Sequence, residues 1–169
     1  NFFIKGPYMM AEGVNRNKRI YPLEEMQRET KRYENMMVKT GRAMGELNHP
    51  TTADVDLERA CHLVTEMSQD GNVFYGKSKV LSTPTGLIVR SLINDGVRVG
   101  MSSRALGQLI PESGSEGVNR VKDFKLVAID CVADPSFPKA FVNGILESKQ
   151  YVVNKYGQFE ESYDTFENN

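Results

Sequence analysis

An alternating apolar and polar run leads into a pair of serines, and this stretch constrains the fold more than any other. Hydrophobic side chains occupy every second position from Val97 to Met101. This period of two predicts a β-strand over residues 97–104 with a buried apolar face. Ser102 then falls on the opposite, open face, whereas Ser103 points inward with the apolar side chains.

Ser102 has neighbours that suit a nucleophile. Gly100 lies on the same face and has no Cβ, so another backbone or a substrate can approach closely beside the serine. Arg98 and Arg104 also belong to this face. A strand end rich in small residues would show the same pattern, so a catalytic serine needs a base elsewhere in the chain.

The chain contains two histidines, and any mechanism that uses an imidazole must choose between them. His49 precedes Pro50, which favours an extended backbone and places the histidine at a strand end or a turn. Asp130 lies in an apolar strand, where a carboxylate is costly unless it is paired. The residues therefore suggest a triad in which His49 takes the proton of Ser102 and Asp130 orients His49.

A metal site is the competing interpretation of the same histidines. Glu46, His49 and His62 are all metal-ligand types. The Glu-x-x-His spacing, however, brings its two ligands together on a helix, and Gly45 and Pro50 argue against a helix there. A serine hydrolase is therefore favoured over a metal hydrolase, and we expect no metal.

The remaining segments predict a mainly β, or α+β, domain. A helix is expected from Pro22 to about Lys39, and a shorter one over residues 87–94. An Asp-Gly turn at 70–71 predicts a hairpin. The strands expected on these patterns cover residues 2–12, 42–47, 57–68, 73–81 and 125–133.

Charge and composition exclude several classes of protein. The net charge is −1, so we expect no bulk nucleic-acid binding. No apolar run approaches the roughly 20 residues that a membrane helix needs. The two cysteines, Cys61 and Cys131, are far apart and predict buried thiols rather than a disulfide framework.

Several segments together resemble the prohead core (capsid maturation) proteases of T-even phages. They are Asn-Arg-Asn-Lys-Arg-Ile-Tyr-Pro at 15–22, Gly-Glu-Leu-Asn-His-Pro at 45–50, the serine segment at 100–107, and the strand that contains Asp130 before the Pro-Ser at 135–136. The resemblance covers most of residues 8–140, in the same order.

That family is similar in fold to the herpesvirus assemblins, which implies a closed β-barrel surrounded by a few helices. On this resemblance His49 is the base and Ser102 the nucleophile. The third member stays open between Asp130 and His62, because assemblins use a second histidine. Backbone N–H groups near Ser103 or Arg104 are expected to form the oxyanion hole, with the Arg104 side chain as a helper.

The resemblance also implies an activity and a place. We expect a serine endopeptidase without a cofactor that cleaves phage scaffold and capsid proteins after Glu, with an aliphatic residue two positions earlier and a small residue following. It would act inside the immature prohead in the host cytoplasm, as a homo-oligomer. Arg98 and Arg104 are candidate contacts for the substrate Glu. The alternative is a scaffold-binding or shell-binding protein of the same fold without catalysis.

A change in composition predicts two parts, a protease domain at 1–145 and a polar tail at 146–169, and the last stretch, residues 160–169, is expected to be loose or helical. The bond after Glu147, which precedes Ser148, fits the cleavage pattern that the resemblance implies. The bond between Glu112 and Ser113 fits it as well. Self-cleavage after Glu147 would remove the tail.

Overall fold

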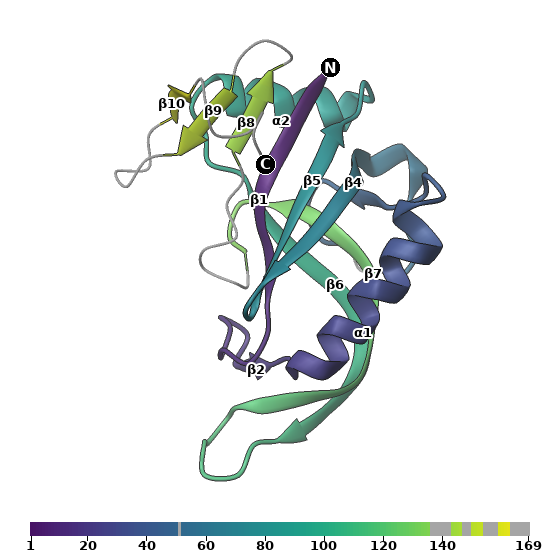
Figure 1. Cartoon of the computed structure of the whole chain (residues 1–169), viewed down its shortest axis with the longest axis vertical. Helices are drawn as coiled ribbons and strands as arrows, with labels where there is room; N and C mark the ends of the chain where they lie inside the picture. The colour runs from purple at the N-terminus through teal and green to yellow at the C-terminus, as the bar shows by residue number, and fades with distance from the viewer. Residues whose placement is uncertain (51, 136–142, 147–149, 154–158, 163–169) are drawn as a thin grey trace.

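Strands dominate the computed structural model, which describes residues 1–50, 52–135, 143–146, 150–153 and 159–162 (Figure 1). The predicted mainly β, α+β class is confirmed. The helical elements are α1 (Leu23–Tyr33), the π-helical turn η1 (Glu34–Val38), the 3₁₀ turn η2 (Leu57–Arg59) and α2 (Pro84–Asn94). The strands are β1 (Phe2–Met10), β2 (Arg19–Ile20), β3 (Met44–Glu46), β4 (Ala60–Asp70), β5 (Val73–Val80), β6 (Gly100–Pro111), β7 (Asn119–Val132), β8 (Asn143–Leu146), β9 (Gln150–Val153) and β10 (Phe159–Ser162).

The strands form two sheets. A seven-stranded sheet has the order β10-β9-β8-β1-β5-β4-β3, and a three-stranded sheet has the order β2-β7-β6. The predicted hairpin is confirmed as β4 and β5, which pair antiparallel up to Asp70 and Val73. β10 is a strand within the stretch that was expected to be loose or helical, so that expectation is wrong for residues 160–162.

Strand pairing joins the two sheets at one place among the described residues, close to the end of β3. Leu47 forms a parallel bridge to Cys131 of β7, and the backbone N–H of Asn48 donates to the Cys131 carbonyl at 2.7 Å. Pairing among the described strands therefore gives two joined sheets and not one closed circuit. The closed barrel stays a prediction.

Helix α1 packs against β7. Its Glu29 carboxylate accepts from the backbone N–H of Leu126 at 2.9 Å, and its Arg32 guanidinium donates to the Leu126 carbonyl at 2.8 Å. Glu25 accepts from the N–H of Phe124 in the same way. Side chains of α1 thus satisfy backbone N–H and C=O groups at an edge of β7, which in a closed barrel would pair with another strand.

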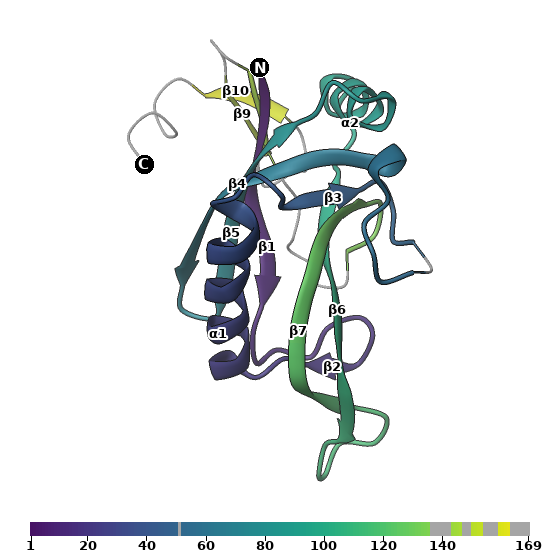
Figure 2. The same ribbon diagram turned by 90° about the vertical axis from the view of Figure 1, so that its right-hand side faces the viewer.

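Strands β6 and β7 form a long antiparallel hairpin that extends below the rest of the molecule as an arm (Figures 1 and 2). β6 starts at Gly100 and continues to Pro111, later and further than the 97–104 predicted from alternation. The difference arises because burial does not alternate along β6: residues 100–102 are buried, residues 103–105 are half-buried, and the rest are exposed but still paired with β7.

The basic loop between β1 and α1 is ordered by one of its own side chains. Asn15 Oδ1 accepts from the backbone N–H groups of Asn17 and Arg19, at 2.9 and 3.0 Å. Such an Asx turn replaces backbone pairing in a tight loop. Arg16 forms an ion pair with Asp134, just after β7. The loop is thereby attached to the end of the strand that carries Asp130.

Buried apolar side chains from β1, α1, β4, β6 and β7 enter one core. Cys61 and Cys131 are free, buried thiols, as expected. Contact with Cys61, followed by burial, raises the pKa of the Cys131 thiol well above its usual range. No helix in the described part of the chain is long and apolar enough to cross a membrane.

The contact between α1 and β7 predicts a measurable loss of stability. Glu29→Ala leaves the buried N–H of Leu126 without its acceptor, which costs about 2–3 kcal/mol. Urea unfolding measures the change, with Glu24→Ala as the control because Glu24 is exposed on the first turn of the same helix. We expect less than about 0.5 kcal/mol from the control. Equal losses in the two variants would contradict the role given to Glu29.

Candidate functional site

Ser102 and Asp130 lie directly opposite each other on β6 and β7. The register pairs Ser102 with Asp130, and Arg104 with Ala128 two positions further on. Opposite residues of an antiparallel pair project to the same face, so Ser102, Arg104 and Asp130 share one side of the hairpin. Ser103 pairs with Ile129 and belongs to the other side.

His49 reaches this face from the segment that follows β3. Asn48 has a φ of +66°, a conformation that asparagine tolerates better than most residues, and it turns the chain toward β7. The Nδ1 atom of His49 then lies 2.7 Å from Oδ2 of Asp130. The imidazole is 40% exposed, whereas the Asp130 side chain is fully buried.

Gly45 explains part of the Gly-Glu-Leu-Asn-His-Pro motif. A Cβ at this position would lie 1.8 Å from the Ile129 carbonyl oxygen and 2.1 Å from Nε2 of His62. Only glycine therefore allows β3 to run this close to β7. That approach is what brings His49 to Asp130.

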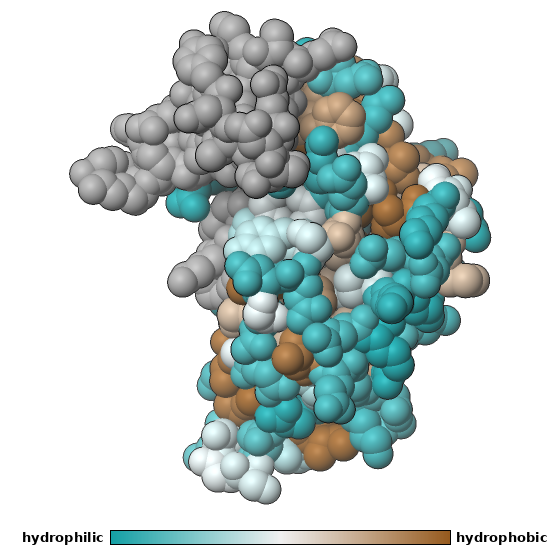
Figure 3. Space-filling model, in the orientation of Figure 1, coloured by the Kyte–Doolittle hydropathy of each residue, from teal (hydrophilic) through white to brown (hydrophobic). Residues whose placement is uncertain are grey.

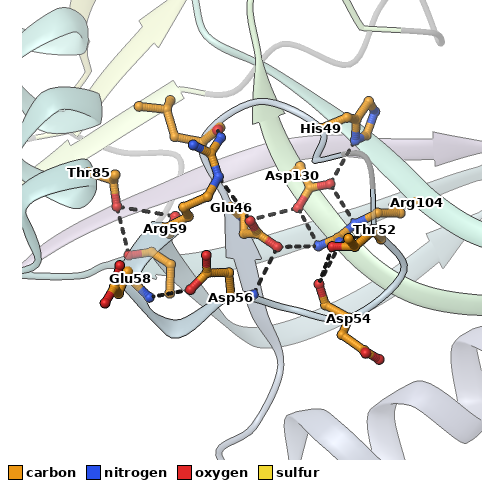
Figure 4. Close-up of polar contacts among 12 residues, drawn as sticks. Glu46, His49, Thr52, Asp54, Asp56, Glu58, Arg59, Thr85, Arg104 and Asp130 are labelled. Carbon is orange, nitrogen blue, oxygen red and sulfur yellow. Dashed lines mark hydrogen bonds and ion pairs between the residues drawn. The ribbon is translucent and has the colours of Figure 1, made fainter.

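The Asp130 carboxylate accepts hydrogen bonds on both oxygens (Figure 4). Oδ1 accepts from the backbone N–H of Glu46 at 2.9 Å and from Arg104 Nη2 at 3.2 Å. Oδ2 accepts from His49 Nδ1 and, at 3.1 Å, from Arg104 Nε. A carboxylate bonded in this way makes His49 donate from Nδ1, which leaves Nε2 as the nitrogen able to accept a proton.

Arg104 and Glu46 extend the polar cluster away from His49. Arg104 Nη2 lies 2.9 Å from Oε2 of Glu46, and the fully buried Glu46 side chain also pairs with Arg59, whose Nε lies 3.2 Å from Oε1. Arg104 Nη1 donates to the carbonyl oxygens of residues 52, 53 and 54, each at 3.1 Å. The Arg104 side chain is only 10% exposed.

The exposure of the two serines differs from the prediction. Ser102 is 3% exposed rather than open, while Ser103 is half-buried and borders a small cavity beside Tyr8 and Met26. The assignment of the two serines to opposite faces is right, but the Ser102 face is covered. Part of the reason is seen at Gly100, where an added Cβ would lie 2.7 Å from Pro135, so the space beside Gly100 is filled by the chain itself.

Arg98 and Arg104, the two candidate contacts for the substrate Glu, lie in different environments. Arg98 is exposed and precedes β6. The donors of Arg104 are engaged by Asp130, by Glu46 and by the carbonyl groups of the loop after His49. The structure brings Arg104 into the cluster of His49 and Asp130.

His62, the other candidate for the third position, lies on β4 behind Asp130. Its Nε2 contacts the Ile129 carbonyl at 2.6 Å, and its Nδ1 has no hydrogen-bond partner among the described residues. Burial lowers the pKa of His62, and the hydrogen bond to Ile129 opposes that shift only partly. His62 is thus a neutral histidine that joins β4 to β7, while Asp130 is the residue that contacts His49.

The proposed metal ligands do not converge. Within the described residues, no group of three His, Cys, Asp or Glu side chains is arranged to hold a metal ion. Glu46 faces two arginines, and His62 faces a backbone carbonyl. The geometry therefore gives no support to the metal-hydrolase interpretation.

Comparison with known proteins agrees with this geometry. The family model of the prohead core protein serine proteases matches residues 1–150. The chain belongs to this family. It is 41% identical, over 144 residues, to the prohead core protein protease of Enterobacteria phage T4, a match that covers 83% of this chain and 67% of the relative.

The fold is also similar to a solved structure. The bacteriophage T4 capsid assembly protease superposes with a TM-score of 0.72 at 37% identity, over 77% of this chain and 80% of that protein. The resemblance predicted from the histidine and serine motifs is therefore confirmed. Membership of this family supports peptidase activity in capsid maturation.

Glu46 is the member of the cluster that sequence reasoning did not recognise. Its residue type and spacing suggested only a metal ligand. The usable signal was its position in the strand before His49, since a carboxylate in a buried strand requires a cation. The sequence alone does not say that Arg104 supplies that cation.

His62 predicts a specific pH dependence of stability. Because its folded pKa lies below the unfolded value near 6.5, the unfolded chain takes up the proton first, and stability falls as the pH drops below about 6.5. His62→Gln can keep a donor for the Ile129 carbonyl but does not titrate. Urea unfolding at pH 7.5 and 5.0 should therefore show a smaller acid-induced loss in His62→Gln than in the unsubstituted protein. An equal loss in both would contradict this account.

Proposed function

We propose that this chain is a serine endopeptidase in which Ser102 is the nucleophile, His49 the general base and Asp130 the carboxylate that orients His49. The observation that carries the proposal is the 2.7 Å contact between His49 Nδ1 and Asp130 Oδ2, with Ser102 directly opposite Asp130 on the neighbouring strand. A base held by a third group beside a nucleophile is the arrangement that acyl transfer requires.

The reaction follows from these positions. Ser102 Oγ attacks the peptide carbonyl while its proton passes to His49 Nε2, and His49 then donates that proton to the leaving amine. Water, activated by the same histidine, hydrolyses the acyl-enzyme and restores Ser102. Backbone N–H groups near Ser103 and Arg104 are proposed to stabilise the oxyanion. The register shift between Arg104 and Ala105 supports this, because a bulge reorients backbone groups next to a site.

The proposal includes a rearrangement before catalysis. Ser102 is only 3% exposed, so a peptide carbonyl reaches its Oγ only after neighbouring chain moves. Association into a homo-oligomer is the proposed source of that change. Exposed apolar side chains on the β6–β7 arm are available for such contacts: Leu106, Leu109 and Ile110. Figure 3 shows apolar side chains (brown) scattered among polar ones on the half of the molecule that includes the arm.

The proposed substrates are phage core and capsid proteins, cleaved after Glu within the immature prohead in the host cell. The relatives, a prohead core protein protease and a capsid assembly protease, support this role. Recognition of Glu requires a cation. Arg98 is the proposed contact, because it is exposed and lies on the segment that leads into β6.

Self-cleavage after Glu147 stays part of the proposal, although residues 147–149 lie outside the described structure. The other fitting bond follows Glu112 at the end of the arm. There the Glu112 carboxylate accepts from Arg120 Nε at 2.9 Å, and Pro111 precedes it. An engaged carboxylate beside a proline is the poorer substrate, which favours Glu147. The division at residue 145 and the closed assemblin-like barrel are likewise retained as proposals.

Peptide cleavage tests the proposed function. A peptide that ends its acyl half in Ile-x-Glu, followed by Ser, is incubated with the unsubstituted protein, Ser102→Ala and Ser103→Ala. We expect Ser102→Ala to lower kcat/KM by at least about 10³-fold, and Ser103→Ala to retain cleavage. Gln in place of Glu in the peptide should raise KM, because the charge that Arg98 would contact is removed.

Loss of cleavage in Ser103→Ala alone would show that the nucleophile is Ser103, on the other face of β6. Binding of scaffold protein without any cleavage by the unsubstituted oligomer would instead favour a non-catalytic member of the family. Circular dichroism of each variant shows whether the loss reflects chemistry or unfolding.

A further inference from the structure

Two fully buried carboxylates share one guanidinium in this protein. Arg104 Nη2 lies 2.9 Å from Glu46 Oε2 and 3.2 Å from Asp130 Oδ1, and Arg104 Nε lies 3.1 Å from Asp130 Oδ2 (Figure 4). Without this partner Asp130 would be a buried charge that lacks its arginine, which is strongly unfavourable, and Glu46 would keep only Arg59. The two acids and the arginine therefore form a single electrostatic unit.

The formal charges of the cluster balance when His49 is neutral. Glu46 and Asp130 contribute two negative charges, and Arg104 and Arg59 contribute two positive charges. An additional negative charge beside the imidazole would favour its protonated form, and a protonated histidine cannot accept the proton of Ser102. A missing negative charge would have the opposite effect.

Arg104 also holds the segment that follows His49. Its Nη1 points at the carbonyl oxygens of residues 52, 53 and 54, and the N–H of Asp56 donates to Glu46 Oε2 at 3.2 Å. The chain on the far side of His49 is thus bound to the Arg104 and Glu46 side chains, and Arg104 also binds Asp130. The planar fork of an arginine suits this task, whereas a lysine offers a single centre.

We infer that Arg104 and Glu46 are positioning residues of the protease: they fix Asp130 and the loop after His49, and their balanced charges keep His49 available as a base. The inference rests on the proposed function. It also replaces the expected role of the Arg104 side chain at the oxyanion or the substrate, because internal acceptors engage its donors.

Several other ionisable groups surround the contact between His49 and Asp130. Asp130 of β7 contacts His49 directly, and the groups packed around that contact are Glu46 of β3, Arg59 of η2, Arg104 of β6, Tyr33 of α1, His62 of β4 and Cys131 of β7. Asp54 and Asp56 of the loop contact this cluster through their backbone groups. Burial, followed by the nearby Asp130 charge, raises the pKa of the Tyr33 hydroxyl, so that group stays neutral. Burial keeps His62 neutral as well. Glu46 and Arg104 are thus the two charged residues whose substitution changes the net charge of the cluster.

The test is the pH dependence of kcat/KM for peptide cleavage in Glu46→Gln, Arg104→Gln and the double variant. The acid limb is the low-pH side of the profile, where kcat/KM falls as the pH decreases. Arg104→Gln should move this limb to higher pH by about one unit, because it leaves an extra negative charge beside His49. Glu46→Gln should move the limb to lower pH by a similar amount. The double variant removes one charge of each sign, so its acid limb should return to that of the unsubstituted protein even though kcat/KM is reduced.

A matched control changes the same kind of buried carboxylate elsewhere. Glu29→Gln removes a charge from the α1 cluster, where Glu29 contacts Arg32 and the backbone of Leu126. We expect lower stability and an unmoved acid limb. Where Arg104→Gln does not fold, Arg104→Lys replaces it, with an unmoved limb and reduced kcat/KM expected because the charge is kept and the bridging geometry is lost.

The outcomes separate this inference from the proposed function. The inference is supported if the acid limbs of Arg104→Gln and Glu46→Gln move in opposite directions and the double variant restores the original limb. Equal, unmoved limbs in folded, Ser102-dependent enzyme overturn it and leave the proposed function standing. Cleavage that persists in Ser102→Ala overturns the proposed function itself, whatever the pH profiles show.

Discussion

The Asp130 carboxylate is the interaction on which the rest of the site depends. It is fully buried, and it accepts from the backbone of Glu46, from His49 and from two nitrogens of Arg104. Those donors come from the β3 strand, the segment after it and β6. One charged group therefore joins the two sheets where they meet, and the cost of burying it is offset only while all of these donors remain in place.

The joint between the sheets explains why the histidine lies where it does. Gly45 lets β3 approach β7, the bridge from Leu47 to Cys131 closes the contact, and the left-handed Asn48 turns His49 back over Asp130. Each of these steps is a backbone requirement. The motif from Gly45 to Pro50 thus determines the backbone conformation that positions His49, and it also supplies functional groups.

Much of the fold was predictable from local pattern, and the interactions across the fold were not. The hairpin at Asp70, helix α1 and the opposite faces of Ser102 and Ser103 follow from turn chemistry and from periods of 3.6 and 2. The burial of Ser102 depends on chain that lies far from it in sequence. The same is true of the partnership of Glu46 with Arg104, which are 58 residues apart and form no pattern in sequence. Nor does local sequence show that side chains of α1 satisfy the edge of β7.

Covalent labelling tests the central claim most directly. A fluorophosphonate reacts with an activated serine, and peptide mass spectrometry identifies the residue that carries the adduct. The account predicts an adduct on Ser102 in active enzyme, and its loss in His49→Ala although Ser102 is still present. An adduct on Ser103, or one on Ser102 that forms equally well without His49, would contradict the account.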